Sequence, residues 1–400
     1  MRYNQNESRS LTMNNFFWET PTKVYFGKGV VDEHLQEVRS HYGKRVLLTY
    51  GKSSIKNRGL YDKVYSLLKG YEIYELSGIE PNPKYNPSVL EGVKICKEKK
   101  IDVILAVGGG SVLDCTKAIA GSAFYDGDPW DIIIGKAETV KALPIVDILT
   151  LAATGSEFDD GGVISRTETN DKLCYSSPLV FPAYSLLDPT YTFSVSKKQT
   201  AAGTADARNH VFEQYFATPS TLLNDGRREA RLRSLRTNVK IALKEPDNYE
   251  ARAQLRWDCS FGCNGILACG SGASSWPRHA MEHALSAYYD ITHGIGLAIL
   301  TPRWREHILN DKSVDRFVSY AKNVLGLKEE GNKFVLAREA IRKTYEFFES
   351  LGIPRHLKDV GIDESRLEER TEHIVEKEGL DKAWEPLYHD DILAILKASL

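Results

Sequence analysis

The first half of the chain alternates short β-rich runs with helical runs, and this alternation restricts the possible folds more than any other feature. Four runs are typical of buried strands, and they lie at residues 44–50, 71–76, 101–107 and 144–151. Helical patterns at 86–100 and 111–123 separate the later ones. Strands that alternate with helices predict a parallel sheet with helices on both of its faces.

Strand patterns disappear after about residue 190. Long helical patterns follow at residues 196–216, 223–243, 248–268, 278–289, 332–352 and 390–400. Because 400 residues exceed the usual size of one hydrophobic core, we expect two domains. We predict a polar extension over residues 1–13, an α/β domain over 14–190 and a helical domain over 191–400.

Composition and charge exclude several classes of partner. The net charge is −2 and no basic stripe is present, so we expect neither a nucleic-acid nor a membrane partner. Neither a signal peptide nor an apolar run of about 18 residues is recognisable, so we expect a cytoplasmic protein. The six cysteines form no CxxC pair. Cys259 and Cys263 are predicted to share a helical face, as core residues rather than as metal ligands.

A glycine-rich segment, AVGGGSVLD at 106–114, follows a predicted strand and opens a predicted helix. Glycines let a ligand approach the backbone closely, and a helix N-terminus offers free N–H groups to phosphate. The motif differs from GxGxxG, so it does not indicate the usual dinucleotide-binding fold. The alternative interpretation is a tight strand-to-helix turn in which Asp114 merely supports the first helical turn.

Two further loops follow predicted strands and are expected to face the same crevice. In YGKSSIKNRG (50–59), Lys52 favours a ribose 2′-phosphate, whereas an acidic residue would favour a free 2′-hydroxyl; the alternative is a solvated lysine. In TLAATGSEFDDGGVISR (150–166), hydroxyl groups and a glycine precede another strand. Thr150, Thr154 and Ser156 there supply donors suited to phosphate or to a nicotinamide amide.

Carboxylate and imidazole groups are concentrated in the second half. Asp206 and His210 are four residues apart, and therefore lie on one helical face. His279 and His283 repeat this spacing, and His293 follows shortly after. One carboxylate and two or three imidazoles from two helices and a turn predict a divalent-metal site. The HxxxH pair lacks the glutamate of HExxH, so zinc-protease chemistry is not favoured.

The chain resembles the iron-containing (group III) alcohol dehydrogenases, in particular the branch of NADPH-dependent butanol dehydrogenases and aldehyde reductases. The resemblance runs from about residue 14 to residue 400. It includes GGGSVLD, TLAATGSE, SLLDPTYTFS, TAAGTAD, EQYF, ALKEPDNYEARA and HAMEHALSAYYDITHGIGLAIL. It implies a dehydroquinate synthase-like fold, in which an α/β dinucleotide-binding domain with a parallel sheet precedes an all-α domain and the active site lies between them.

The resemblance also assigns residues. It implies that one divalent ion, Fe²⁺ first and Zn²⁺ as the alternative, is held by Asp206, His210, His279 and His293. His283 then becomes a non-ligand that relays a proton. The implied NADP(H) contacts are Lys52 and Ser54 on the adenosine side, Gly109, Gly110, Ser111 and Asp114 at the diphosphate, and Thr150, Thr154, Lys172 and Tyr191.

The expected reaction is reversible hydride transfer between NADPH and a small aldehyde or primary alcohol, in a homodimer. The chain departs from the family pattern at Asp159 and Asp160, whose carboxylates would repel a polyanionic cofactor unless Lys172 or Arg166 compensates them. These two residues leave a catalytically weak metal-binding relative as one alternative. A polyol dehydrogenase of the glycerol type is another alternative, because the same architecture supports that activity.

Overall fold

The computed structural model describes residues 13–57, 59–217, 220–272 and 274–400. Its first half contains a six-stranded sheet in the order β1-β8-β5-β4-β2-β3, in which every neighbouring pair is parallel. The strands are β1 (Lys23–Phe26), β2 (Arg45–Tyr50), β3 (Glu72–Leu76), β4 (Val103–Gly108), β5 (Ile145–Leu149) and β8 (Tyr184–Leu187). The predicted parallel sheet is confirmed.

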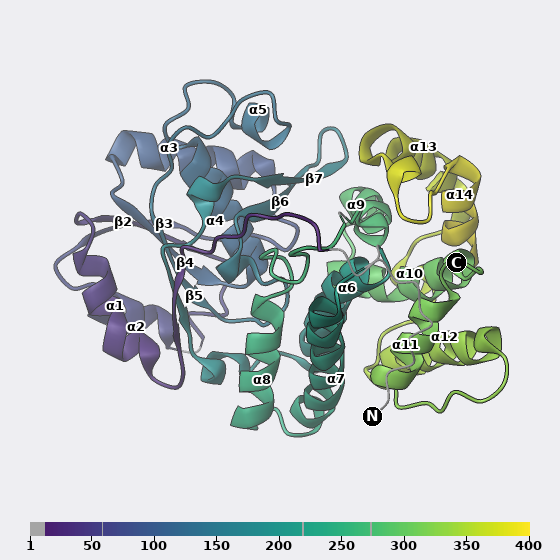
Figure 1. Ribbon diagram of the computed structural model, residues 1–400. Helices are drawn as coiled ribbons and strands as arrows, with labels where there is room; N and C mark the ends of the chain where they lie inside the picture. The colour runs from purple at the N-terminus through teal and green to yellow at the C-terminus, as the bar shows by residue number, and fades with distance from the viewer. Residues whose placement is uncertain (1–12, 58, 218–219, 273) are drawn as a thin grey trace.

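Helices cover both faces of this sheet, as Figure 1 shows. Successive residues of β4 point to opposite faces, so Ile104 packs into one apolar core and Leu105 into the other. The core that contains Ile104 is closed by α3 (Leu90–Lys99), α4 (Gly110–Ser122) and α5 (Pro129–Ile133). The other core is closed by α1 (Val30–Ser40) and α2 (Leu60–Leu67).

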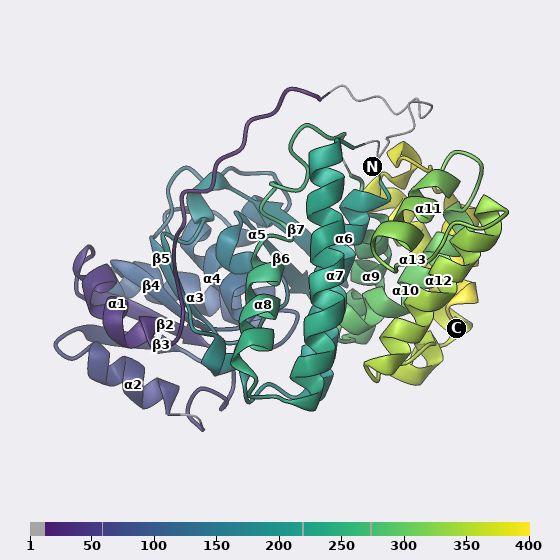
Figure 2. The same ribbon diagram turned by 60° about the horizontal axis from the view of Figure 1, so that its bottom comes forward.

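The second half is helical in its described residues, as predicted. Helix α6 (Lys197–Tyr215) is buried at every position from Thr200 onward, because other helices surround it. The other helices of this half, among the described residues, are α7 (Leu222–Lys244), α8 (Tyr249–Ser260), α9 (Pro277–Tyr289), α10 (His293–Ile308), α11 (Val314–Asn323), α12 (Lys333–Ser350), α13 (Leu367–Glu378) and α14 (His389–Ala398). In Figures 1 and 2, α8 lies on the side of α6 that faces the sheet domain, and α10 to α14 lie on the opposite side.

An antiparallel hairpin, β6 (Gly161–Arg166) and β7 (Asp171–Ser176), extends from the sheet domain toward the helices. Strand β7 reaches α9, where Lys172 Nζ lies 2.7 Å from Ser286 Oγ. Asn82 and Lys84, from the loop after β3, both donate to Asp290 just beyond α9. The two halves of the chain therefore meet along α9.

Three details differ from the sequence-based expectations. The edge strand β1 and the strand β8 were absent from the four predicted strands, because each has only four residues. The helix expected over 248–268 ends at Ser260. Gly265 beyond it has a φ of +82°, which a helix cannot continue through. Cys263 therefore does not share a helix with Cys259. None of the helices within the described ranges is long and apolar enough to cross a membrane.

Candidate metal centre and cofactor crevice

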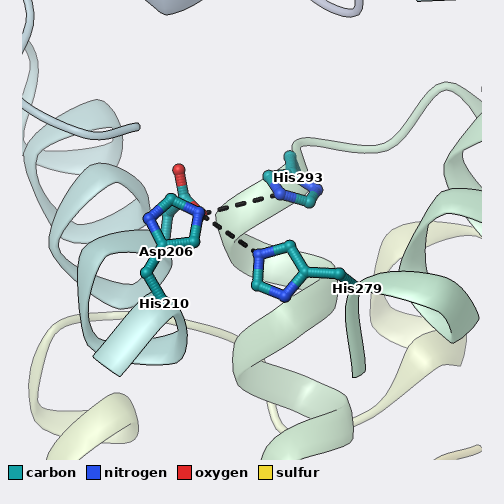
Figure 3. Close-up of side chains that lie close together, drawn as sticks. All are labelled: Asp206, His210, His279 and His293. Atoms are coloured by element: carbon teal, nitrogen blue, oxygen red, sulfur yellow. Dashed lines mark ion pairs between the residues drawn. The ribbon is translucent and has the colours of Figure 1, made fainter. Parts of the chain in front are cut away.

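Four ligand-type side chains meet where α6, α9 and α10 come together (Figure 3). From Asp206 Oδ1, the Nε2 atoms lie 3.1 Å away in His210, 4.0 Å in His279 and 3.6 Å in His293. One potential ligand atom from each of the four residues lies within 4.8 Å of the others. The sequence-predicted quartet is thus brought together in space.

Close backbone packing makes this convergence possible. Gly294, the second residue of α10, lies so close to α6 that a Cβ there would be 2.0 Å from the carbonyl oxygen of Ala202. Any side chain at this position would push the two helices apart. Since His293 begins α10 and Asp206 lies one turn along α6 from Ala202, Gly294 fixes the separation of these two groups.

Burial leaves the quartet poorly satisfied without a cation. Asp206 Oδ1 and His279 Nε2 form no hydrogen bond, although both are shielded from solvent. Burial raises the pKa of Asp206 to about 7 and lowers the pKa of His210 to about 4. A carboxylate oxygen without a hydrogen bond, surrounded by imidazole nitrogens, matches the donor set of Fe²⁺ or Zn²⁺. The residues therefore fit a divalent metal.

A carboxylate that the sequence analysis missed orients His279. Glu213, on α6, is fully buried, and its Oε1 accepts from His279 Nδ1 at 3.1 Å and from the His279 backbone N–H at 3.0 Å. Its Oε2 accepts from Arg278 Nη2 at 2.8 Å. Because Nδ1–H donates to Glu213, the lone pair on Nε2 is turned toward Asp206.

A second buried carboxylate does the same for His293. Glu282 Oε2 accepts from His293 Nδ1 and from Lys172 Nζ, the latter at 3.2 Å. Each of the two histidines is thus backed by a buried carboxylate, and each carboxylate has one cation beside it. The lysine comes from β7, so the sheet domain contributes directly to the metal centre.

His283 lies beside the quartet rather than within it. Its ring centroid is 5.3 Å from that of His293 and 6.0 Å from that of His279. Burial, followed by the positive charge of Lys172, lowers the pKa of His283 well below its ordinary value. The imidazole is therefore neutral at neutral pH.

Strand β4 ends at Gly108, at the carboxyl edge of the parallel sheet. Helix α4 begins there without a side-chain cap, so its first N–H groups are available to an anion. Glycine is required at this turn, because a Cβ on Gly110 would lie 2.5 Å from Thr154 Oγ1. Beside it lies a cavity of about 210 Å³ lined by Ser54, Ile55, Leu60, Thr150, Thr190, Tyr191 and Ser194.

Three of the sequence-predicted cofactor residues, Ser54, Thr150 and Tyr191, line this cavity. Gly109 and Gly110 stand at the turn into α4, and Ser111 follows them. Asp114 instead braces the β6 strand, since its carboxylate accepts from Ser156 Oγ at 2.7 Å and from the Val163 N–H at 3.1 Å. Its contact with a diphosphate stays a prediction.

The counter-charge expected for Asp159 was wrong. Neither Lys172 nor Arg166 pairs with it; Lys172 binds Glu282, and Arg166 lies over the rings of Tyr85 and Trp130. Lys117, a fully buried residue of α4, lies 2.6 Å from Asp159 Oδ1 and also donates to two backbone carbonyls. The negative charge of Asp159 is therefore compensated within the sheet domain.

Comparisons with known proteins bear on the whole chain. Residues 21–189 match the model of the family described as iron-containing alcohol dehydrogenase, and residues 200–400 match the C-terminal model of the Fe-containing alcohol dehydrogenase family. The chain is 49% identical over 391 residues to an NADH-dependent butanol dehydrogenase A of Clostridium acetobutylicum, covering 97% of this chain and 100% of that protein.

Two further relatives differ in the cofactor that they name. An NADPH-dependent aldehyde reductase of Escherichia coli is 41% identical over 360 residues, which cover 89% of this chain and 91% of that protein. The solved structure of an NADH-dependent butanol dehydrogenase A from Thermotoga maritima superposes with a TM-score of 0.91 at 36% identity, covering 97% of this chain and 99% of that one.

Proposed function

Since the chain belongs to the iron-containing alcohol dehydrogenase family and is an oxidoreductase of alcohols and aldehydes, we propose that it interconverts small aldehydes and primary alcohols with NADPH and one divalent metal. The observation that carries this proposal is the convergence of four ligand atoms, one carboxylate oxygen and three imidazole nitrogens, within 4.8 Å of one another. We also propose that the boundary between the α/β domain and the helical domain lies at about residue 190. The family resemblance leads us to expect a homodimer.

We assign the metal to Asp206, His210, His279 and His293, with Fe²⁺ as the expected ion and Zn²⁺ as the alternative. When bound, the ion supplies Lewis acidity that polarises the carbonyl group of the aldehyde. The protein's own contribution is to hold the imidazoles in one tautomer and orientation, through Glu213 behind His279 and through a second carboxylate behind His293.

We assign NADPH to the crevice at the carboxyl ends of the strands. The open N-terminus of α4 suits the diphosphate, and Gly109, Gly110 and Ser111 form the turn there. The 210 Å³ cavity beside Ser54 and Tyr191 suits the adenosine end. Asp114, Thr150, Thr154 and Lys172 complete the proposed contacts. Lys52 supports NADPH rather than NADH, because its ammonium favours a 2′-phosphate.

His283 is proposed as the proton relay. Hydride transfer to a carbonyl carbon leaves negative charge on the oxygen, and a proton must follow to give the alcohol. The imidazole lies beside His279 and His293 but belongs to neither of their carboxylate pairs. It can therefore exchange a proton with the product oxygen without disturbing the ligands.

The test begins with protein purified without oxygen and loaded with Fe²⁺ or Zn²⁺. NADPH oxidation with butanal is followed by absorbance, and metal content is measured on the same sample. His279→Ala is expected to lose both metal and activity. His307→Ala is the matched control, because this histidine pairs with Asp391 on the surface away from the centre. Full activity in His279→Ala would refute the ligand assignment.

The two alternatives give different results in the same assay. A catalytically weak relative would retain metal and bind NADPH without oxidising it in the presence of any aldehyde. A polyol dehydrogenase would oxidise glycerol in preference to butanol. The compensation of Asp159 by Lys117 removes one of the two carboxylates that motivated the expectation of weak cofactor binding, and Asp160 is the other.

A further inference from the structure

We infer that Glu80 sets the balance between NADPH and NADH by drawing Lys52 away from the adenosine 2′-phosphate. Lys52 Nζ lies 3.1 Å from Glu80 Oε1, both side chains are exposed, and Lys52 lies two residues before Ser54, which lines the cavity. The inference rests on the proposed cofactor site and adds a residue that no motif in the sequence indicated.

The backbone holds these two residues beside each other. Lys52 follows β2 and Glu80 follows β3, and the two strands are parallel neighbours with Thr49 paired to Leu76. Beyond the strands, the Gly78 N–H donates to the Gly51 carbonyl at 3.0 Å, and the Ile79 N–H donates to the Tyr50 carbonyl at 3.3 Å. The ion pair therefore stands on two loops that are hydrogen-bonded to each other.

The other lysine in the described part of this loop is engaged elsewhere. Lys56 Nζ lies 5.4 Å from the ring centroid of Tyr50 and 4.6 Å from that of Tyr61. Its pKa is raised, first by its interaction with Tyr50. Lys52 is thus the lysine of this loop that forms an ion pair with a carboxylate. The negative charge of that carboxylate reduces the attraction between Lys52 and a phosphate.

The chemistry of the two cofactors differs only at the ribose 2′ position. A 2′-phosphate is attracted by Lys52 and repelled by Glu80, whereas a 2′-hydroxyl can donate a hydrogen bond to a carboxylate. Glu80 therefore weakens NADPH binding and supports NADH binding. A chain with both residues accepts either cofactor, and the charge at position 80 decides the ratio.

The experiment measures binding rather than turnover. Dissociation constants of NADPH and NADH are obtained from the fluorescence of the reduced nicotinamide with the purified full-length protein. Glu80→Gln is expected to tighten NADPH binding about fivefold, the size of one exposed charge interaction, and to leave NADH binding unchanged or weaker. The gain should shrink at high salt, because exposed charges are screened.

Two variants distinguish an electrostatic role from a structural one. Glu80→Asp retains the charge and should preserve the NADPH/NADH ratio of the unmodified protein. Glu329→Gln removes a comparable exposed pair, with Lys322, in the helical domain and should change neither constant. An unchanged ratio in Glu80→Gln, with both cofactors still bound, overturns this inference alone. Failure of the unmodified protein to bind either cofactor overturns the proposed function and the inference with it.

Discussion

Replacing Glu213 with glutamine tests whether a buried carboxylate behind the metal centre determines metal affinity. The substitution preserves the shape of the side chain and removes its charge. Glu213 accepts hydrogen bonds from His279 and Arg278, and its side chain is fully buried. The change therefore weakens the acceptor that orients His279 and leaves the Arg278 guanidinium without a counter-ion.

The magnitude follows from the same contacts. Burial by itself would raise the pKa of Glu213, but Arg278 and His279 outweigh burial and lower the pKa from 4.5 to about 2. A change of this size corresponds to roughly 3 kcal/mol, which agrees with the cost of about 3–5 kcal/mol for breaking a buried ion pair. Loss of such an outer carboxylate usually lowers metal affinity about 10- to 100-fold.

Two measurements separate the effects on folding and on the metal. Urea denaturation of the metal-free protein should show a loss of about 3 kcal/mol in Glu213→Gln. Competition with a chromophoric chelator should show the 10- to 100-fold loss in Zn²⁺ affinity. Adding Arg278→Met to Glu213→Gln removes the unpaired cation, so it should restore much of the stability but not the metal affinity. Zn²⁺ binding of Glu213→Gln at the unmodified level would refute the reasoning.

Three other substitutions have distinct expected outcomes. Asp159→Asn leaves Lys117 buried without a counter-charge, so urea denaturation should show a loss of about 3–5 kcal/mol; an unchanged midpoint would mean that the pair contributes nothing. Burial raises the pKa of Asp258 from 3.8 to about 6, so stability falls as the pH rises between these two values and the full cost of the ionised form is present above about pH 6. Asp258→Asn should therefore increase stability at pH 7.5 by at most about 3 kcal/mol and give no increase near pH 3, where the carboxyl is mostly protonated in both states; an equal increase at both pH values would contradict this. His283→Asn should retain metal but lower kcat, and a kcat equal to that of the unmodified protein would exclude the relay.

The architecture could be predicted because each half of the chain has one dominant periodicity. Strand β4 reads as a continuous apolar run, since it is buried on both faces. Strands β1 and β8 escaped prediction because each has only four residues, and β1 also lies at the sheet edge, where neither face is fully covered. The C-terminal limit of α8 was misplaced because apolar residues continue past Ser260, while the backbone turns at glycines.

The metal quartet could be recognised as a group because imidazole is rare and its spacing on α6 and α9 repeats the helical turn. The carboxylates behind it also lie at a helical spacing from the ligands, three residues instead of four. Glu213 lies three residues after His210, and Glu282 three residues after His279, so each shares a helical face with a proposed ligand. Glutamate is common on helices, however, and only the packing of α9 against α6 and β7 shows which glutamates are buried beside an imidazole.

Lys117 shows what a sequence can reveal about a buried charge and what it cannot. Every residue of α4 from Val112 to Ser122 is buried, so the helix has no solvent face on which a lysine could lie. A lysine in such a helix requires a partner, because an isolated buried ammonium group is too costly. The partner itself, Asp159, lies 42 residues further along the chain on the turn before β6. The need for a counter-charge could therefore be deduced from the apolar pattern of the helix, whereas its identity depends on how the hairpin folds back onto α4.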